Sequence, residues 1–507
     1  MSTNEPSIPR CNHQMKYSYQ PPTFTDQHRL EKIKNVLPIV QKHFQNVFEK
    51  NHFPGLAYGL VVDGELLDSH CFGYTNLEQQ IPVTTKSLFS IASITKSFTA
   101  MAIIKLRDDG QLRLDDPIDQ YIPELKMIDP VTKDAPTLTI RHFLTHNVGM
   151  TKDDPWADRQ SGLSDDDFVA ILKKGVTLSN PPGSVWEYTN LGYAILNRLV
   201  TVVSQVPHEE YIKREILIPL GMTNTIWESS EAPLDLLAQG YRWQSDHYAL
   251  ENSVYEEPPG IIAGLISSIE DFSKYISYHL QAWPPRDEPE YGPIRRSSLR
   301  EMQHPWNFIE LTKNTNNPNV FETSAYGYGL FWLKTSDGLV IVRHDGALPG
   351  FGSNWLMLPE YGIGLVSFAN SNHAELRDAN QTIISQLIKE ADLKTRELPV
   401  SNHLAERKQE LMKIVLEQQW NDSEKSATFA QNFFLDESLD QRKSSLEELF
   451  KEIGKILSIG EIVPKNQLRG HFDVQCEHTT IRIVFSLSPE NPPLVQELTV
   501  SKSTSSS

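Results

Sequence analysis

The first clear pattern of apolar and polar positions in the chain is helical. Between Gln27 and Lys50 the apolar residues recur at the three- and four-residue spacing of one helix face: Leu30, Ile33, Val36, Leu37, Val40, Phe44, Val47 and Phe48. Two β-rich runs follow at 55–62 and 66–72, and the Asp63-Gly64 pair between them is a hairpin signal. This order predicts the beginning of a sheet that is covered by a helix.

Strand patterns return only after residue 325. They lie at 326–332 and 339–344 and in a hairpin formed by 353–358 and 364–369, and a closing helix is predicted over 374–391. The stretch 107–235 carries little strand signal and several helix-like segments separated by Pro and Gly. We therefore expect an α+β fold, with an antiparallel sheet flanked by helices and an all-helical subdomain at about 107–235.

The two ends of the chain differ from this main domain at 27–395. Residues 1–26 are polar and read as an N-terminal arm. Residues 396–507 show helices at 403–420 and 439–457, followed by strands at 468–474, 480–487 and 495–500. This order predicts a small C-terminal α+β accessory domain, which we expect to cap the main domain or to mediate homo-oligomer formation.

Composition excludes some function classes. The chain has 507 residues and a net charge of −18, which argues against electrostatic binding of nucleic acid or of an anionic membrane. Its three cysteines, Cys11, Cys71 and Cys476, show neither a disulfide framework nor a metal-binding spacing. No apolar run approaches the length of a membrane span, and no signal peptide is legible. A cytoplasmic location is the expectation, with a periplasmic or secreted one as the alternative.

The strongest candidate for chemistry is Ser93-Ile94-Thr95-Lys96, which follows an apolar run and opens a predicted helix. Three residues make about one helical turn, so the Lys96 amine can lie beside the Ser93 hydroxyl. A serine becomes a nucleophile when a neighbouring base takes its proton and nearby dipoles stabilise the oxyanion, and a helix N-terminus supplies such dipoles. Read alone, the motif also fits a capping serine followed by a solvated lysine.

Two further polar groups suit the same chemistry. Tyr188 and Asn190 are expected on a loop just before an apolar helix, where a tyrosine beside a cationic lysine can have a lowered pKa and relay protons. His344 precedes Gly346 in a predicted strand, and its side chain is expected to face the cleft while the glycines let the backbone approach a ligand. Capping, packing and structural roles remain the alternatives for these residues.

His142 and His146 lie four residues apart in a short predicted helix, which is the spacing of a metal-binding pair. No glutamate or third ligand accompanies them, so we expect a packed, hydrogen-bonded role and predict no metal and no cofactor.

Taken together, Ser93-x-x-Lys96, Tyr188-x-Asn190 and His344-x-Gly346, in this order, resemble the class C serine β-lactamases and the low-molecular-weight penicillin-binding proteins. The phrases at 139–150, 181–196, 260–268 and 344–370 are also similar to that family. The resemblance covers about residues 30–395 and not the tail.

The resemblance implies a role for each matching residue. Ser93 would be the acylated nucleophile, Lys96 its base, and Tyr188 a partner in proton transfer. Asn190 would hold a substrate amide. The oxyanion hole would be formed by the backbone N–H groups of Ser93 and Ala347, and Gly346 belongs to the same substrate-binding strand.

One departure from the family pattern bears on the substrate. This chain has His344-Asp345-Gly346 where β-lactamases usually carry Lys-Thr-Gly, and a histidine is only partly charged near pH 7. The His-x-Gly form resembles D-aminopeptidases and esterases of the family. We expect a serine hydrolase that forms an acyl-enzyme with a small ester, amide or short peptide (esterase, D-aminopeptidase or D-Ala carboxypeptidase-like). The alternatives are a penicillin-binding sensory module that turns over slowly and a true β-lactamase.

Overall fold

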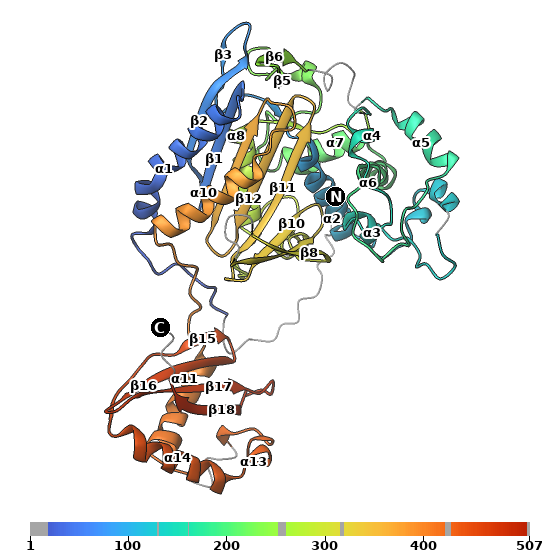
Figure 1. Cartoon of the computed structure of the whole chain (residues 1–507). Coiled ribbons are helices and arrows are strands. Elements are labelled where there is room, and N and C mark those ends of the chain that lie inside the picture. The colour runs from blue at the N-terminus through green and yellow to red at the C-terminus, as the bar shows by residue number, and fades with distance from the viewer. Residues whose placement is uncertain are drawn as a thin grey trace, which may run out of the picture. The chain divides into compact units, whose positions relative to one another are not determined.

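The computed structural model describes residues 19–128, 131–160, 162–251, 260–314, 319–420 and 427–503 (Figure 1). The chain divides into two compact units. One is 26–395, and the other combines the described parts of 1–25 and of 396–507. Most of the predicted N-terminal arm, 1–18, lies outside the described residues.

The larger unit is built on one antiparallel sheet with the order β3-β2-β1-β13-β12-β11-β10-β9-β8. Its strands are β1 (Gly55–Val62), β2 (Glu65–Asn76), β3 (Ile81–Pro82), β8 (Asn307–Lys313), β9 (Phe321–Tyr326), β10 (Phe331–Thr335), β11 (Val340–Leu348), β12 (Phe351–Leu358) and β13 (Ile363–Ala369). The early hairpin joins the late strands through β1 and β13, with Tyr58 opposite Ser367. The predicted antiparallel sheet and α+β class are confirmed.

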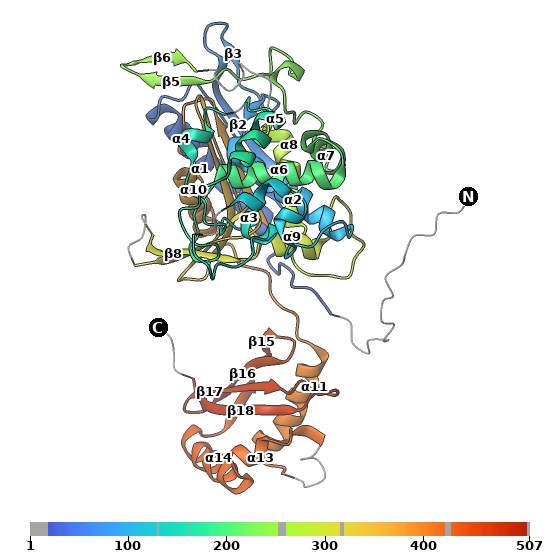
Figure 2. The ribbon, with the colours of Figure 1, turned by 90° about the vertical axis from the view of Figure 1, so that its right-hand side faces the viewer.

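Helices cover both faces of this sheet (Figures 1 and 2). α1 (Arg29–Lys50) and α10 (Arg377–Glu390) pack on one face, and α8 (Ile269–Leu280) packs on the other. All eight residues of β1 are buried as a result, which explains why its sequence is apolar throughout instead of alternating. Phe44 of α1 stacks on Tyr58 of β1 with their ring centroids 4.2 Å apart.

The segment between the early hairpin and the late strands is largely helical. Its helices are α2 (Thr95–Asp108), α3 (Ile140–Leu144), α4 (Asp154–Ala157), α5 (Asp165–Lys174), α6 (Asn190–Ser204) and α7 (His208–Ile212), with single turns at Ala92–Ile94, Ile118–Gln120, Pro123–Met127, Lys213–Leu217 and Ser229–Glu231. After it come the small pair β5 (Tyr241–Gln244) with β6 (His247–Leu250), the strand β7 (Ile266–Ser267) and α9 (Arg296–Met302). β7 pairs with β4 (Phe89–Ser90), which precedes the helical segment. α2 packs against α6, so the candidate serine lies where sheet and helices meet.

The prediction of one strand over 326–332 is wrong. Tyr326 ends β9, Phe331 begins β10, and the residues between them form the turn of a hairpin. Gly329 has a φ of +70°, and a Cβ there would lie 2.8 Å from the Lys96 carbonyl oxygen. The aromatic run is therefore a tight turn against α2. The sequence analysis also missed β8, whose residues are mostly exposed and follow no strict alternation.

The smaller unit has a sheet of order β14-β16-β17-β18, with β15 also paired to β16. Its elements are α11 (Asn402–Leu411), a π-helical turn (Met412–Leu416), α13 (Phe433–Asp436), α14 (Leu439–Ile453), β14 (Ile456–Ile459), β15 (Val463–Asn466), β16 (Arg469–Cys476), β17 (Thr480–Leu487) and β18 (Val495–Lys502). α14 ends four residues earlier than its predicted end at Leu457, because Gly454 takes a φ of +73°. The α-helix predicted over 403–420 stops at Leu411.

None of the helices in the described ranges has the length and the apolar character that crossing a bilayer needs.

Truncating the ring that joins α1 to the sheet should destabilise the larger unit. Phe44 is fully buried, so Phe44→Ala removes its contacts and leaves a cavity, which costs about 3–5 kcal/mol. Leu30→Ala on the same helix is the control, because Leu30 is 43% exposed and such surface changes stay within about 0.5 kcal/mol. Calorimetry should show a lower melting temperature for the Phe44 variant only. Equal melting temperatures would contradict the packing described.

Candidate active site

Ser93 lies in a single helical turn (Ala92–Ile94) that leads directly into α2. Ala92, the residue before it, has a φ of +49°, which turns the chain sharply out of β4. The backbone is fixed on both sides, because the Ile91 N–H donates to the Leu265 carbonyl (2.9 Å) and the Leu265 N–H donates to Thr95 Oγ1 (2.9 Å). The serine is thus presented at a helix start by a rigid support.

Lys96 lies against Ser93, as the three-residue spacing predicts. Its Nζ donates to Ser93 Oγ at 3.0 Å and to Asn190 Oδ1 at 2.6 Å. The side chain is buried, and this loss of water lowers the pKa of the amine to about 8, although the charges of Asp153, Asp154 and Asp158 act in the opposite direction. An appreciable fraction of the amine is therefore neutral near pH 7 and can accept a proton.

Tyr188 lies over the same amine, with Lys96 Nζ 4.9 Å from its ring centroid. The expectation that the lysine lowers the pKa of this tyrosine is wrong in direction. Burial of the phenol raises its pKa well above 10, and a hydrogen bond with Ser93 opposes that rise only in part. Tyr188 is accordingly a neutral hydroxyl at physiological pH, able to donate one proton and accept another.

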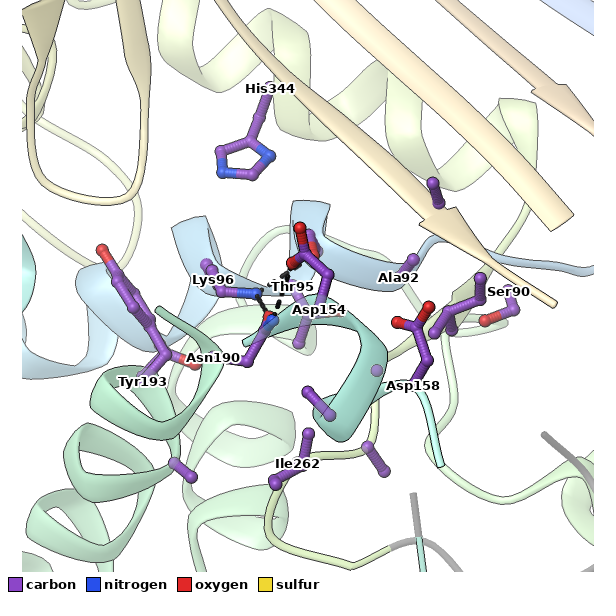
Figure 3. Close-up of a pocket in the computed structure, with 18 of the residues that line it drawn as sticks. Ser90, Ala92, Thr95, Lys96, Asp154, Asp158, Asn190, Tyr193, Ile262 and His344 are labelled. Atoms are coloured by element: carbon purple, nitrogen blue, oxygen red, sulfur yellow. Dashed lines mark hydrogen bonds between the residues drawn. The ribbon is translucent and has the colours of Figure 1, made fainter. Parts of the chain in front are cut away.

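Asn190 is the first residue of α6, not a loop residue, and the N-cap is Thr189, whose hydroxyl accepts from the Gly192 N–H. Its amide bridges Lys96 to two carboxylates: Nδ2 donates to Asp153 Oδ1 (3.1 Å) and to Asp154 Oδ1 (2.9 Å) while Oδ1 accepts from Lys96. Figure 3 shows Lys96, Asn190 and Asp154 joined in this row. Both amide protons are engaged within the protein, which leaves the second lone pair of Oδ1 for a ligand.

His344 points toward Lys96 from the opposite side of the cavity (Figure 3). Both of its ring nitrogens have partners in the protein: Nδ1 donates to the Asp345 carbonyl (2.7 Å), and Nε2 accepts from the Tyr326 hydroxyl (3.0 Å). Burial, followed by the charge of Lys96, lowers its pKa to about 4. His344 is neutral at pH 7, so the expected partial charge is absent at that position.

Gly346 is required by a close approach between backbones. A Cβ at this position would lie 2.2 Å from the Ile91 carbonyl oxygen and 2.3 Å from Ser353 Oγ. The missing side chain lets β11 run against the segment that carries Ser93, whereas the sequence suggested an approach to a ligand. Ala347, the next residue, is exposed and lines the cavity.

These residues surround one cavity of about 830 Å³. It brings Ser93, Lys96, Tyr188, Asn190, His344 and Ala347 together, whereas Gly346 lies behind its wall. Aromatic walls come from Trp186, Trp227 and Phe331. The charged or ionisable residues of its lining include five carboxylates and two lysines: Asp154, Asp158, Glu187, Glu228, Asp345, Lys96 and Lys152.

The two paired histidines have hydrogen-bonding roles. His142 Nδ1 accepts from the Thr139 N–H (3.1 Å) and so completes the cap of α3. His146 is fully buried behind Tyr188, and its Nδ1 accepts from the Thr189 N–H (3.2 Å). His142 thus completes a helix cap, and His146 supports the backbone between Tyr188 and Asn190.

The model of the family described as Beta-lactamase matches residues 40–388, more than half of the chain. The chain belongs to the beta-lactamase family. Protein flp of Staphylococcus aureus (strain N315) is 27% identical over 340 residues, which are 66% of this chain and 63% of that protein. Penicillin-binding protein 4* of Bacillus subtilis (strain 168) is 25% identical over 354 residues, which are 65% of this chain and 72% of that protein. The matched region thus spans less than two thirds of the staphylococcal relative.

Two solved structures share the fold of this beta-lactamase-family chain. An octameric penicillin-binding protein homologue from Pyrococcus abyssi has a TM-score of 0.60 at 20% identity and covers 92% of this chain and 95% of its own. A penicillin-binding protein from Bacillus halodurans has a TM-score of 0.55 at 22% identity, with 68% and 99% covered. The first of these similarities extends into the C-terminal unit, which lies outside the matched family region.

Sequence reasoning missed three residues of this beta-lactamase-family site. Asp153 and Asp154 hold Asn190, and Tyr326 holds His344. The adjacent pair of acids, two residues beyond the family-like stretch at 139–150, was a signal for the first two. The sequence contains no comparable signal for Tyr326. This residue was predicted to lie inside a strand, and its hydrogen-bond partner His344 is 18 residues further along the chain.

Gly346→Ala should disturb the position of Ser93 without unfolding the protein. The new methyl group meets a backbone carbonyl, so β11 or the serine turn must move, and a shift of that size can lower reactivity by tenfold or more. Ser353→Ala is the control, since it removes only the hydroxyl that donates to the Ile91 carbonyl. The rate of Ser93 modification by a fluorophosphonate, followed by mass spectrometry, should fall by at least about tenfold only in Gly346→Ala. A wild-type rate in that variant would be evidence against the close approach.

Proposed function

We propose that this protein is a serine hydrolase that forms an acyl-enzyme at Ser93 and acts on a small ester or amide, including D-amino-acid peptides. The supporting observation is the buried Lys96 amine, which lies 3.0 Å from Ser93 Oγ and has its pKa lowered to about 8. A nearby amine that is partly neutral at physiological pH is the base that a serine nucleophile needs.

The proposed reaction begins when neutral Lys96 accepts the Ser93 proton and Oγ attacks the substrate carbonyl carbon. The backbone N–H groups of Ser93 and Ala347 would stabilise the oxyanion. As the oxyanion collapses, the bond to the leaving group breaks, and Tyr188 would deliver a proton to it while receiving one from Lys96. Water then attacks the acyl carbon while Lys96 and Tyr188 take up its proton. As the bond between Ser93 Oγ and the acyl carbon breaks, that proton passes to Ser93 Oγ and the acid is released.

The charge of the cavity favours neutral or cationic substrates. His344 is neutral and its two nitrogens are engaged, so it offers no cation to a substrate carboxylate. Both lysines of the lining already have partners in the protein. Lys96 Nζ donates to Ser93 Oγ, and Lys152 Nζ lies 3.3 Å from Asp154 Oδ2. The carboxylates of the lining would repel an anionic group.

The alternatives keep penicillin as the ligand. Two of the relatives and structural neighbours are named penicillin-binding proteins, which favours a module that is acylated by penicillin and turns over slowly, or a true β-lactamase. The neutral His344 weighs against both.

We also propose that the C-terminal unit is an accessory domain for assembly into a homo-oligomer, since the octameric homologue covers 92% of this chain.

An intact-mass time course should separate these functions. Wild type and Ser93→Ala are mixed with p-nitrophenyl acetate and, separately, with penicillin G. We expect the ester to be consumed only by the wild type, through a transient adduct on Ser93, and penicillin to leave neither an adduct nor an opened product. A lasting Ser93-dependent penicillin adduct would identify a penicillin-binding module, and opened penicillin would identify a β-lactamase.

A matched pair of amides should report the charge preference. D-alanine p-nitroanilide carries a free amine, and its N-succinyl derivative carries a carboxylate at the same end. We expect kcat/KM to be at least about tenfold higher for the free amine, because like charges placed together in a cleft cost several kcal/mol. The N-acetyl derivative controls for size and should fall between the two. A preference for the succinyl compound would contradict the charge argument.

A further inference from the structure

Asn190 connects the proposed base to two acids that the family motifs do not include. Its Oδ1 accepts from Lys96 Nζ, and its Nδ2 donates to Asp153 and Asp154. Carboxylates can only accept, so Nδ2 must face them and Oδ1 must face the lysine. The orientation of the amide is thereby determined by the acids.

We propose that Asp153 and Asp154 are positioning residues: acting through Asn190, they direct the Lys96 amine toward Ser93, and their charges hold a proton on that amine. This inference rests on the proposed function of Ser93 and Lys96. Neither acid hydrogen-bonds to Ser93 or Lys96 within the described residues, so each would act through its neighbour.

The need for positioning follows from the chemistry of the amine. A lysine ammonium is a point charge on a flexible stem with three donors that can rotate. A fixed acceptor on one side determines which of its remaining positions faces the serine. Asn190 Oδ1 provides that acceptor at 2.6 Å, and the hydrogen bonds from Asn190 Nδ2 to the two acids keep it in that orientation.

Asp153 also has a structural role, which makes it the less suitable of the two acids for a mutational test. Its carboxylate accepts from the backbone N–H groups of Asn190 (2.7 Å) and Leu191 (2.8 Å) and from the Thr189 hydroxyl (3.2 Å). It therefore also caps the start of α6, where a negative charge is favourable. Its loss would disturb the helix as well as the lysine.

Asp154 is the better residue to test. Its Oδ1 accepts from Asn190, its Oδ2 lies 3.3 Å from Lys152 Nζ, and its side chain is 40% exposed. Replacement by asparagine removes the charge but keeps an oxygen that can accept from Asn190. Replacement by alanine removes both.

Several other groups face Lys96 and remain in place in these variants. Asp153 and Asp158 favour its charged form, whereas His146 and His344 are themselves affected by its charge and are kept neutral by burial. The rings of Tyr188 and Tyr193 lie 4.9 Å and 5.8 Å from Nζ. Burial lowers the pKa of Lys96, so removing one of the opposing carboxylates should lower it further.

Two measurements on the full chain test the proposal. Competitive acetylation with trace acetic anhydride across pH, read by mass spectrometry, reports the pKa of Lys96 directly. The rate at which a fluorophosphonate labels Ser93 across pH reports the reactivity of the serine and its plateau at high pH. The variants are Asp154→Asn and Asp154→Ala, with Asp165→Asn and Asp165→Ala on α5 as controls, since Asp165 pairs with Arg198 outside the cavity.

In the wild type, both profiles should rise with a midpoint near pH 8. Asp154→Asn should move both midpoints down by about one pH unit, which raises labelling at pH 7 roughly fivefold and leaves the plateau unchanged. Asp154→Ala should show the same shift and a plateau lower by about tenfold, because Asn190 loses an anchor. The Asp165 variants should match the wild type.

Two results would overturn the proposal. One is a wild-type midpoint for Lys96 acetylation in Asp154→Asn, and the other is an undiminished plateau in Asp154→Ala. Failure of the proposed function looks different, since Ser93 would then remain unlabelled in the wild type. The acetylation profile would still decide whether the two acids control the amine of Lys96.

Discussion

The site depends on the burial of one amine. Burial of Lys96 destabilises its charged form and so lowers its pKa. The amine can therefore exchange a proton with Ser93 near neutral pH. Burial without nearby negative charge would lower the pKa of this amine further. Three carboxylates oppose it, two of them through the amide of Asn190. The properties of the base therefore result from a balance between burial and fixed negative charge.

The fold serves this balance by bringing distant segments into one small volume. The helix that carries Lys96 begins against β11, and only a glycine at position 346 allows the two backbones to approach. The turn between β9 and β10 lies against the same helix through Gly329. α6 adds Asn190 from the other side. Because backbone contacts set these positions, the serine, the lysine and the amide are placed before any substrate arrives.

His344 illustrates how the same fold can change what a site accepts. Where the resemblance leads one to expect a cation, this chain places a ring whose nitrogens are used by Tyr326 and by the Asp345 carbonyl. The lining of the cavity contains more carboxylates than lysines, and the ring of His344 that points toward Lys96 is neutral. Under the proposed function, the preference for a substrate charge and the capacity for acyl transfer are thus controlled by different residues.

The sequence by itself determined the α+β class, the helix–hairpin beginning, the three strands after residue 338 and the Ser93–Lys96 pair, because these depend on local periodicity and on a spacing of one helical turn. It could not reveal the turn at 327–330 or the partners of His344 and Asn190, since those contacts join residues far apart in the chain. The pKa directions of Tyr188 and His344 were likewise decided only by the tertiary structure. Burial and neighbouring charge set a pKa, and both exist only once the chain has folded.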